Sequence, residues 1–268
     1  MRTIAELMNL AGRRALVTGG AGHIGSAAAE SLVELGSTVG ILDIDDEACE
    51  KTVDRLNRAR PGAAMPIPCD LRDEQATRTA VRAVIKQLGG LDVFVHCAAY
   101  VGTTQVPGWA VSFEEQSVAA WEAAFRVNLT SAFVAVQEAR TALAASGRGS
   151  VIFVSSTYGM VGPDMRLYEG TQMGRQPAGY AASKGGLIQL ARYLATVLAP
   201  HVRVNVVTPG GVWRQQPELF RQRYVTRTPM GRMATEEDMK GAVVYLASDL
   251  SAYVTGQNLV VDGGWTVW

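Results

Sequence analysis

A tyrosine and a lysine four residues apart are the side chains in this sequence whose types and spacing most directly suggest chemistry. Tyr180 and Lys184 lie in a helix-prone segment, where positions i and i+4 share one face of the helix. An ammonium group beside a phenol favours the phenolate, so Lys184 is expected to lower the Tyr180 pKa from its ordinary value of about 10. Such a phenol can donate or accept a proton near neutral pH. Of the eight tyrosines only Tyr180 has this lysine, although surface neighbours that do no chemistry can share the spacing.

A glycine-rich turn near the amino terminus predicts a dinucleotide site. The turn, residues 19–25, follows an apolar run at 14–18 and precedes a helical pattern at 26–35. Glycines let backbone N–H groups approach phosphates, and the start of a helix favours negative charge. The alternative is a tight turn that binds nothing. The order strand, glycines, helix favours a pyrophosphate site.

Two aspartates at the ends of predicted strands are candidates for binding the adenosine half of the cofactor. Asp43 is placed to accept hydrogen bonds from both ribose hydroxyls, and its charge would repel a 2′-phosphate. Asp70 is placed to meet the adenine amino group. The alternative for each is a helix cap, a role that Asp45 or Asp46 could take in place of Asp43. The pattern favours NAD over NADP.

The elements that must position these residues alternate between strand and helix. Apolar runs that end in glycine or polar residues predict strands at 14–18, 38–42, 64–69, 93–98, 151–155, 203–207 and 258–262. Helical patterns lie at 26–35, 47–56, 74–88, 113–126, 128–145 and from Tyr180 to about Leu198. This rhythm predicts an α/β, doubly wound Rossmann fold with a parallel seven-stranded sheet and helices on both faces.

The whole chain, 1–268, reads as a single domain, because no linker, repeat or shift in composition divides it. The least regular stretches are about 158–177 and 209–233, and both follow predicted strands. Ligands of such sheets bind outside the carboxyl ends of the strands. These two loops are therefore expected to form the substrate cleft.

Composition excludes several other classes of function. Twenty-five basic residues balance twenty-five acidic ones, so nucleic acid and anionic membrane surfaces are not expected partners. The three cysteines and three histidines show no metal-ligand spacing, so no metal site is expected and the thiols are expected to be reduced. No signal-peptide core and no membrane-length apolar run is present. These features predict a cytoplasmic protein with a small-molecule substrate.

Several motifs in a fixed order resemble the short-chain dehydrogenase/reductase family of single-domain type. The resemblance runs nearly end to end and rests on Thr18-Gly19 to Gly25, Asp70, Asn128-Leu129, Ser155-Ser156, Tyr180 to Lys184, Asn205 to Gly210, Thr228 to Arg232, Tyr253 to Gln257 and Val261 to Gly264. The Pro209-Gly210-Gly211-Val212 stretch and the Gly-Gly-Trp-Thr tail are similar to members linked to sugar and surface-polysaccharide metabolism.

The resemblance implies a role for each of four catalytic residues. Tyr180 would be the general acid/base, and Lys184 would hold the nicotinamide ribose and depress the Tyr180 pKa. Ser156 would hydrogen-bond the substrate oxygen, and Asn128 would anchor a water that links Lys184 to solvent. The alternatives are purely structural roles, in which Ser156 caps a turn and Asn128 breaks a helix. The implied NAD-binding residues are Gly19, Ala21, Gly22, His23, Ile24, Gly25, Asp43, Asp70, Leu71, Ala98, Tyr180, Lys184, Pro209, Gly210 and Val212.

The sequence departs from the family pattern at four places. His23 stands where glycine is usual, and the resulting spacing matches that of the larger sugar-nucleotide epimerases. His96-Cys97-Ala98-Ala99 replaces the usual Asn-Asn-Ala-Gly, and the threonine often found after Pro209-Gly210 is absent. Ser156 and Tyr180 are separated by 180 − 156 = 24 positions against about a dozen in common members. About eleven residues are thus inserted beside the site.

The motifs and the family resemblance leave three hypotheses for the function. The leading one is an NAD-dependent oxidoreductase acting on a secondary alcohol or ketone. The alternatives are an epimerase or dehydratase with tightly held NAD, which would normally add a substrate domain, and a non-catalytic NAD-binding scaffold. The polar loops predict a sugar-like, polyol or anionic substrate that contacts Ser156, Tyr180, Trp213, Arg214 and Arg166, although loop arginines are as often solvated.

A homotetramer is the expected assembly. The family resemblance implies it, and Trp265 and Trp268 near the carboxyl terminus would need a surface to cover them. The alternative is that these rings fold back on their own subunit.

Overall fold

Seven parallel strands in the order β3-β2-β1-β4-β5-β6-β7 form the centre of the molecule. The computed structural model describes all 268 residues. The strands are β1 (Arg14–Thr18), β2 (Thr38–Asp43), β3 (Ala64–Pro68), β4 (Val93–His96), β5 (Gly149–Val154), β6 (Val202–Pro209) and β7 (Asn258–Val261). The predicted fold class and all seven predicted strands are confirmed, with ends that differ by up to two residues.

The helices are α1 (Ile4–Met8), α2 (His23–Glu34), α3 (Asp46–Ala59), α4 (Glu74–Leu88), α5 (Val118–Phe125), α6 (Ser131–Ala145), α7 (Ala178–Val197), α8 (Glu218–Thr226) and α9 (Glu237–Ala247). Short 3-10 turns are η1 (Phe113–Glu115), η3 (Thr157–Gly159), η4 (Met165–Leu167) and η5 (Asp249–Ser251), and η2 (Arg126–Thr130) is a π-helical turn. None of the helices is long and apolar enough to cross a membrane.

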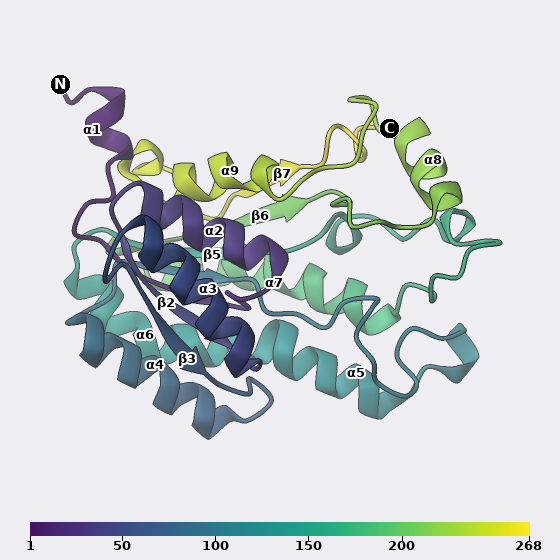
Figure 1. The fold of residues 1–268 in the computed structure, drawn as a ribbon, viewed down its shortest axis with the longest axis horizontal. Helices are drawn as coiled ribbons and strands as arrows, with labels where there is room; N and C mark the ends of the chain where they lie inside the picture. Colours follow the sequence, from purple (N-terminus) through teal and green to yellow (C-terminus); the bar gives the residue numbers. More distant parts are fainter.

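Alternating residues of the strands send side chains to two separate cores. Ala15 and Val17 of β1 join one core, whereas Leu16 joins the other. Helices α2, α3 and α9 cover the first core, and α4, α6 and α7 cover the second (Figure 1). This alternation is what a parallel sheet buried on both faces requires. Strands β2 and β3 follow β1 on one side and β4 to β7 lie on the other, so the strand order reverses between β1 and β4. Ligands of such sheets bind in the crevice at this point, outside the carboxyl ends of the strands.

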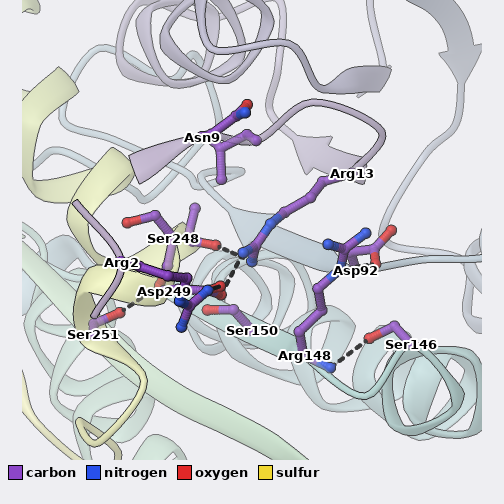
Figure 2. Close-up of polar contacts among 12 residues, drawn as sticks. Arg2, Asn9, Arg13, Asp92, Ser146, Arg148, Ser150, Ser248, Asp249 and Ser251 are labelled. Carbon is purple, nitrogen blue, oxygen red and sulfur yellow. Dashed lines mark hydrogen bonds and ion pairs between the residues drawn. The ribbon is translucent and has the colours of Figure 1, made fainter. Parts of the chain in front are cut away.

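The opposite end of the sheet is closed by buried ion pairs. Arg13, just before β1, donates to the Ala247 carbonyl and pairs with Asp249 (Figure 2). Asp92, just before β4, accepts from Arg14 at 2.7 Å and from Arg148, just before β5, at 3.1 Å. These contacts tie the amino ends of three strands together, far from the crevice.

The structure differs from the predicted helices in several respects, and α1 and α9 lie where no helix was predicted. The predicted helix at 113–126 is divided, because Ser117 caps a new helix by accepting from the Ala120 N–H at 3.1 Å. Helix α6 follows a π turn in which the Ser131 N–H bonds the Arg126 carbonyl. The stretch predicted as the irregular loop 209–233 contains the regular helix α8.

Candidate active site

The glycine turn between β1 and α2 has no room for a Cβ at Gly19 or Gly25. Gly19 has φ 63°, and a Cβ there would lie 2.6 Å from the Ala98 nitrogen. A Cβ at Gly25 would lie 2.0 Å from the Gly19 carbonyl oxygen. Helix α2 begins at His23, and its cap residue Gly22 offers no side chain to its first N–H groups, which lie at a cavity. This arrangement fits the phosphates of a dinucleotide.

A cavity of about 390 Å³ lies along this turn. Of the predicted cofactor residues it is lined by Gly19, Gly22, His23, Ile24, Gly25, Asp43, Asp70, Leu71 and Ala98. Ala21, Tyr180, Lys184, Pro209, Gly210 and Val212 are not among its lining residues. The lining also includes side chains that sequence reasoning did not single out, among them Ile44, Cys69, Arg72, Tyr100, Val101, Thr104 and Val127.

Asp43 and Asp70 face this cavity and do not cap helices. Asp43 accepts from the Ala21 N–H at 3.1 Å and from the Ile44 N–H at 2.8 Å. The cap of α3 is Asp45, and the cap of α4 is Asp73. Asp70 instead forms a bidentate pair with Arg72, whose guanidinium holds the pKa of the Asp70 carboxyl below its ordinary value.

Tyr180 and Lys184 lie on one face of α7, beside the end of β5. The Lys184 Nζ is 5.8 Å from the centroid of the Tyr180 ring and donates to the Val154 carbonyl at 2.7 Å. Burial lowers the pKa of Lys184 to about 8. The Ser156 hydroxyl faces the Tyr180 phenol and also accepts from the Tyr158 N–H at 3.2 Å, so it caps η3 as well.

The expectation that Lys184 lowers the Tyr180 pKa is wrong for this structure. Burial is the largest influence on the Tyr180 pKa and raises it above its ordinary value. The Ser156 hydroxyl and the charge of Arg214 offset part of this rise. Helical spacing predicted the shared face, but not that Lys184 would be buried, with its ammonium bonded to a carbonyl oxygen, and Tyr180 half-buried.

Asn128 lies within the π turn η2 and bridges the crevice to the catalytic helix. Its side-chain oxygen accepts from the Tyr100 N–H at 2.7 Å, and its amide donates to the Ser183 hydroxyl at 2.9 Å. Ser183 in turn donates to the Tyr180 carbonyl at 2.9 Å. Asn128 is thus fully buried and fixed relative to α7.

His96 is a site residue whose contacts the sequence did not predict. Its Nδ1 lies 2.8 Å from the Thr18 hydroxyl and its Nε2 lies 3.2 Å from the Asn128 carbonyl. Because a carbonyl only accepts, Nε2 carries the proton and Nδ1 accepts from Thr18. Burial and the nearby Lys184 charge lower the His96 pKa to about 3, so this ring is neutral. The only feature of the sequence that singled out His96 was its place where the family pattern has asparagine.

The predicted substrate residues do not all gather at this site. Arg214 lines the cofactor cavity and pairs with Glu236 at 3.1 Å. Trp213 lies under the Arg221 guanidinium, 5.7 Å from its carbon. The Arg166 side chain is 77% exposed, pairs with Asp164 at 2.8 Å and lines a different, outward hollow.

An aromatic cluster joins the inserted segment, α8 and the carboxyl-terminal tail beside Ser156. It consists of Leu167, Tyr168, Phe220, Tyr224, Met233 and Trp265, with Tyr158 packed against it. Tyr158 follows Ser156 by two positions, and its hydroxyl lies 3.1 Å from that of Tyr168. Trp265 is only 4% exposed and folds back on its own chain, so it does not need the partner surface that the sequence suggested.

Comparison with known proteins agrees with this architecture. Residues 19–266 match the family model described as enoyl-(acyl carrier protein) reductase. The chain is 33% identical over 264 residues to the 2,5-dichloro-2,5-cyclohexadiene-1,4-diol dehydrogenase of Sphingobium indicum, covering 96% of this chain and 98% of the relative. It is 30% identical over 267 residues to a sorbose reductase of Schizosaccharomyces pombe, covering 98% and 99%.

A solved structure with the same fold is the NADPH-dependent 3-quinuclidinone reductase of Rhodotorula rubra. It has a TM-score of 0.85 and 27% identity, covering 100% of this chain and 96% of that one. The family match spans nearly the whole chain, and the relatives align from end to end. The chain therefore belongs to the short-chain dehydrogenase/reductase family of oxidoreductases.

Proposed function

We propose that this protein is an NAD-dependent dehydrogenase or reductase that interconverts a secondary alcohol and a ketone on a small cyclic or sugar-like substrate. The observation that carries the proposal is that Tyr180 and Lys184 share one face of α7 at the end of β5, the strand that Ser156 follows. A glycine turn and Asp43 line the adjoining cavity. Bound nicotinamide dinucleotide supplies the acceptor or donor of the hydride.

The residues of the chain handle the proton and the substrate oxygen. Tyr180 takes a proton from the alcohol in oxidation and returns one to the oxygen in reduction. Ser156 donates a hydrogen bond to the same oxygen and stabilises negative charge that develops there. The Lys184 ammonium lies on the same face of α7 as Tyr180 and is the group that would hold the nicotinamide ribose.

Asp43 supports the choice of NAD. Its carboxylate is fixed by two backbone N–H groups and lines the cavity where the adenosine ribose would lie. A 2′-phosphate at that position would meet a like charge. An arginine could attract a 2′-phosphate, but Arg72, the cavity arginine nearest to Asp43 in the sequence, is already paired with Asp70.

The substrate class is supported by the walls of the site and by the relatives. Aromatic rings next to Ser156 suit the apolar face of a ring, while hydroxyls of Tyr158 and Tyr168 and the amide of Gln176 suit its polar groups. The names of two relatives describe activity on a cyclic diol and on a sugar.

A panel of cyclic diols, polyols and ketoses, assayed with NAD and NADP by the absorbance of reduced cofactor, tests the function. We expect turnover with NAD to exceed that with NADP strongly. Asp43→Ser should narrow that ratio by roughly tenfold or more, because it removes the charge that repels the 2′-phosphate.

Asp45→Ser is the matched control, since Asp45 caps α3 and does not line the cavity. This variant should keep the wild-type preference for NAD. Equal use of NAD and NADP by the wild type would contradict the role of Asp43. Dinucleotide binding without turnover on any substrate would favour the scaffold alternative.

A further inference from the structure

The cofactor cavity contains two guanidinium groups, and only one of them is fully engaged. Arg72 makes a bidentate pair with Asp70, with contacts of 2.9 Å and 2.6 Å. Arg214 reaches its partner Glu236 only through Nε, at 3.1 Å, and its two terminal nitrogens make no hydrogen bond within the protein. Because Arg carries five N–H donors, Arg214 keeps most of them available to the cavity.

The backbone around Arg214 is held in an uncommon conformation. The next residue, Gln215, has φ 58° and is the only non-glycine residue with positive φ. The Arg214 N–H donates to the Gln216 side chain at 2.7 Å, and the Gln216 amide donates back to the Val212 carbonyl at 2.9 Å. A left-handed residue that is not glycine persists only where its surroundings enforce it, and such positions concentrate at ligand sites. This turn therefore fixes where Arg214 enters the cavity.

Arg214 lies between the start of α2 and the catalytic tyrosine. On one side, its partner Glu236 is 3.6 Å from the His23 Nδ1, in the first turn of α2. On the other side, Arg214 shares the cavity wall with Tyr100, whose N–H donates to Asn128 at the catalytic helix, and the charge of Arg214 lowers the Tyr180 pKa. A dinucleotide that runs from Asp43 to Tyr180 would place its pyrophosphate between the start of α2 and the catalytic helix. The Arg214 guanidinium lies in that interval, away from the adenosine end.

We propose that Arg214 binds the nicotinamide-side phosphate of the dinucleotide, and that Glu236 competes with that phosphate for the guanidinium. This inference rests on the proposed function, because it takes a nicotinamide dinucleotide as the ligand. Arg suits a phosphate because its planar fork donates two parallel hydrogen bonds to the oxygens. It also moves Arg214 from the substrate, where the sequence alone suggested it, to the cofactor.

In this arrangement the Glu236 carboxylate is expected to weaken dinucleotide binding. Its carboxylate lies beside the start of α2, where it would repel phosphates and hold Arg214 back from them. Neutralising Glu236 should therefore tighten dinucleotide binding. The gain should depend on Arg214, because the two residues act through the same ion pair.

Calorimetric titration with ADP-ribose and with AMP tests the proposal independently of turnover. Arg214→Met should weaken ADP-ribose binding by roughly tenfold and AMP binding by less than about twofold, because AMP lacks the second phosphate. Arg214→Lys should recover part of the loss. Arg221→Met is the matched control: Arg221 also pairs with a glutamate, Glu218, but does not line the cavity, so both affinities should remain.

A double-mutant cycle completes the test. Glu236→Gln should tighten ADP-ribose binding several-fold in the wild-type background and by less in the Arg214→Met background. Unchanged ADP-ribose affinity in Arg214→Met, or an equal loss for AMP, would overturn the inference. An altered substrate KM with unchanged ADP-ribose affinity would return Arg214 to the substrate. If the wild type binds neither ADP-ribose nor NAD, the proposed function itself fails.

Discussion

At the scale of single residues, burial decides the electrostatics of the site. Spacing alone places Tyr180 and Lys184 together, and the structure brings them to a ring-to-nitrogen distance of 5.8 Å. Burial nevertheless raises the Tyr180 pKa and lowers that of Lys184 to about 8. The sequence could predict which groups are neighbours, but not how far each is removed from water.

His96 belongs to the same scale and links the two halves of the site. A buried chain of hydrogen bonds runs from Thr18 through His96 to Asn128, and from Asn128 through Ser183 to the Tyr180 backbone. Thr18 directly precedes the glycine turn. The chain therefore connects the cofactor turn to the catalytic helix, and we infer that His96 is a positioning residue.

Replacing His96 with phenylalanine tests this role. The ring volume stays similar, but Thr18 and the Asn128 carbonyl lose their partner, so we expect kcat to fall by roughly tenfold while ADP-ribose affinity changes less than about twofold. Steady-state kinetics and calorimetry measure the two effects. Phe94→Leu, in the same strand and core region, is the control for lost stability alone. A His96→Phe protein with reduced stability and wild-type kcat would show a merely structural role.

At the scale of elements, the strands were the most predictable part of the molecule. Strands buried on both faces are continuous apolar runs, such as 151–154, and such runs are visible in the sequence. Helix α8 was missed because it buries only Phe220 and Tyr224 and has no side-chain cap. The π turn at η2 was missed because its bonds to the fifth preceding residue leave no mark in the pattern of apolar positions.

The two polar loops were predicted as a cleft, yet they pack through aromatic side chains. Phe220 of α8 lies 5.3 Å from the Tyr168 ring of the inserted segment and 5.9 Å from Tyr224. Arg227, just after α8, pairs with Asp164 of the insertion. The sequence shows that polar side chains are abundant in both loops. It does not show that their few aromatic side chains, such as Tyr168 and Phe220, pack against one another.

Phe220→Ala tests whether this cluster supports the substrate site. Losing the ring leaves a cavity that destabilises the cluster by about 3 kcal/mol, and the substrate KM should rise while ADP-ribose affinity stays the same. Thermal unfolding, kinetics and calorimetry measure the three quantities. Leu219→Ala, at the exposed neighbouring position, should change none of them appreciably. An unchanged KM in Phe220→Ala would mean that the cluster lies apart from the substrate.

At the scale of the whole molecule, the arrangement of strands was predictable from the sequence. Seven parallel strands lie in one sheet, as the alternation of strand and helix predicted. Of the two tryptophans near the carboxyl terminus, Trp265 is buried within its own chain. Only Trp268, at 76% exposure, is left for a partner subunit to cover. Phe133 and Tyr193 are further exposed aromatic side chains that an assembly could cover.

A homotetramer remains our prediction, on the ground of family membership. Light scattering at micromolar concentration should give about four times the chain mass of 28.6 kDa. Tyr193→Glu is expected to shift the mass downward if that exposed ring lies between subunits. A mass near 28.6 kDa for the wild type would contradict the tetramer.

The central claim is that Tyr180 transfers the proton in a dehydrogenase reaction, and Tyr180→Phe tests it most directly. Tyr180 packs against the cluster of Trp109, Ala120 and Ala124, so phenylalanine should keep the fold and the affinity for ADP-ribose. Production of NADH from the best alcohol of the panel should fall by about a thousandfold, because only the acid/base hydroxyl has been removed. Turnover within about tenfold of wild type, in a purified variant that still binds ADP-ribose, would contradict the account.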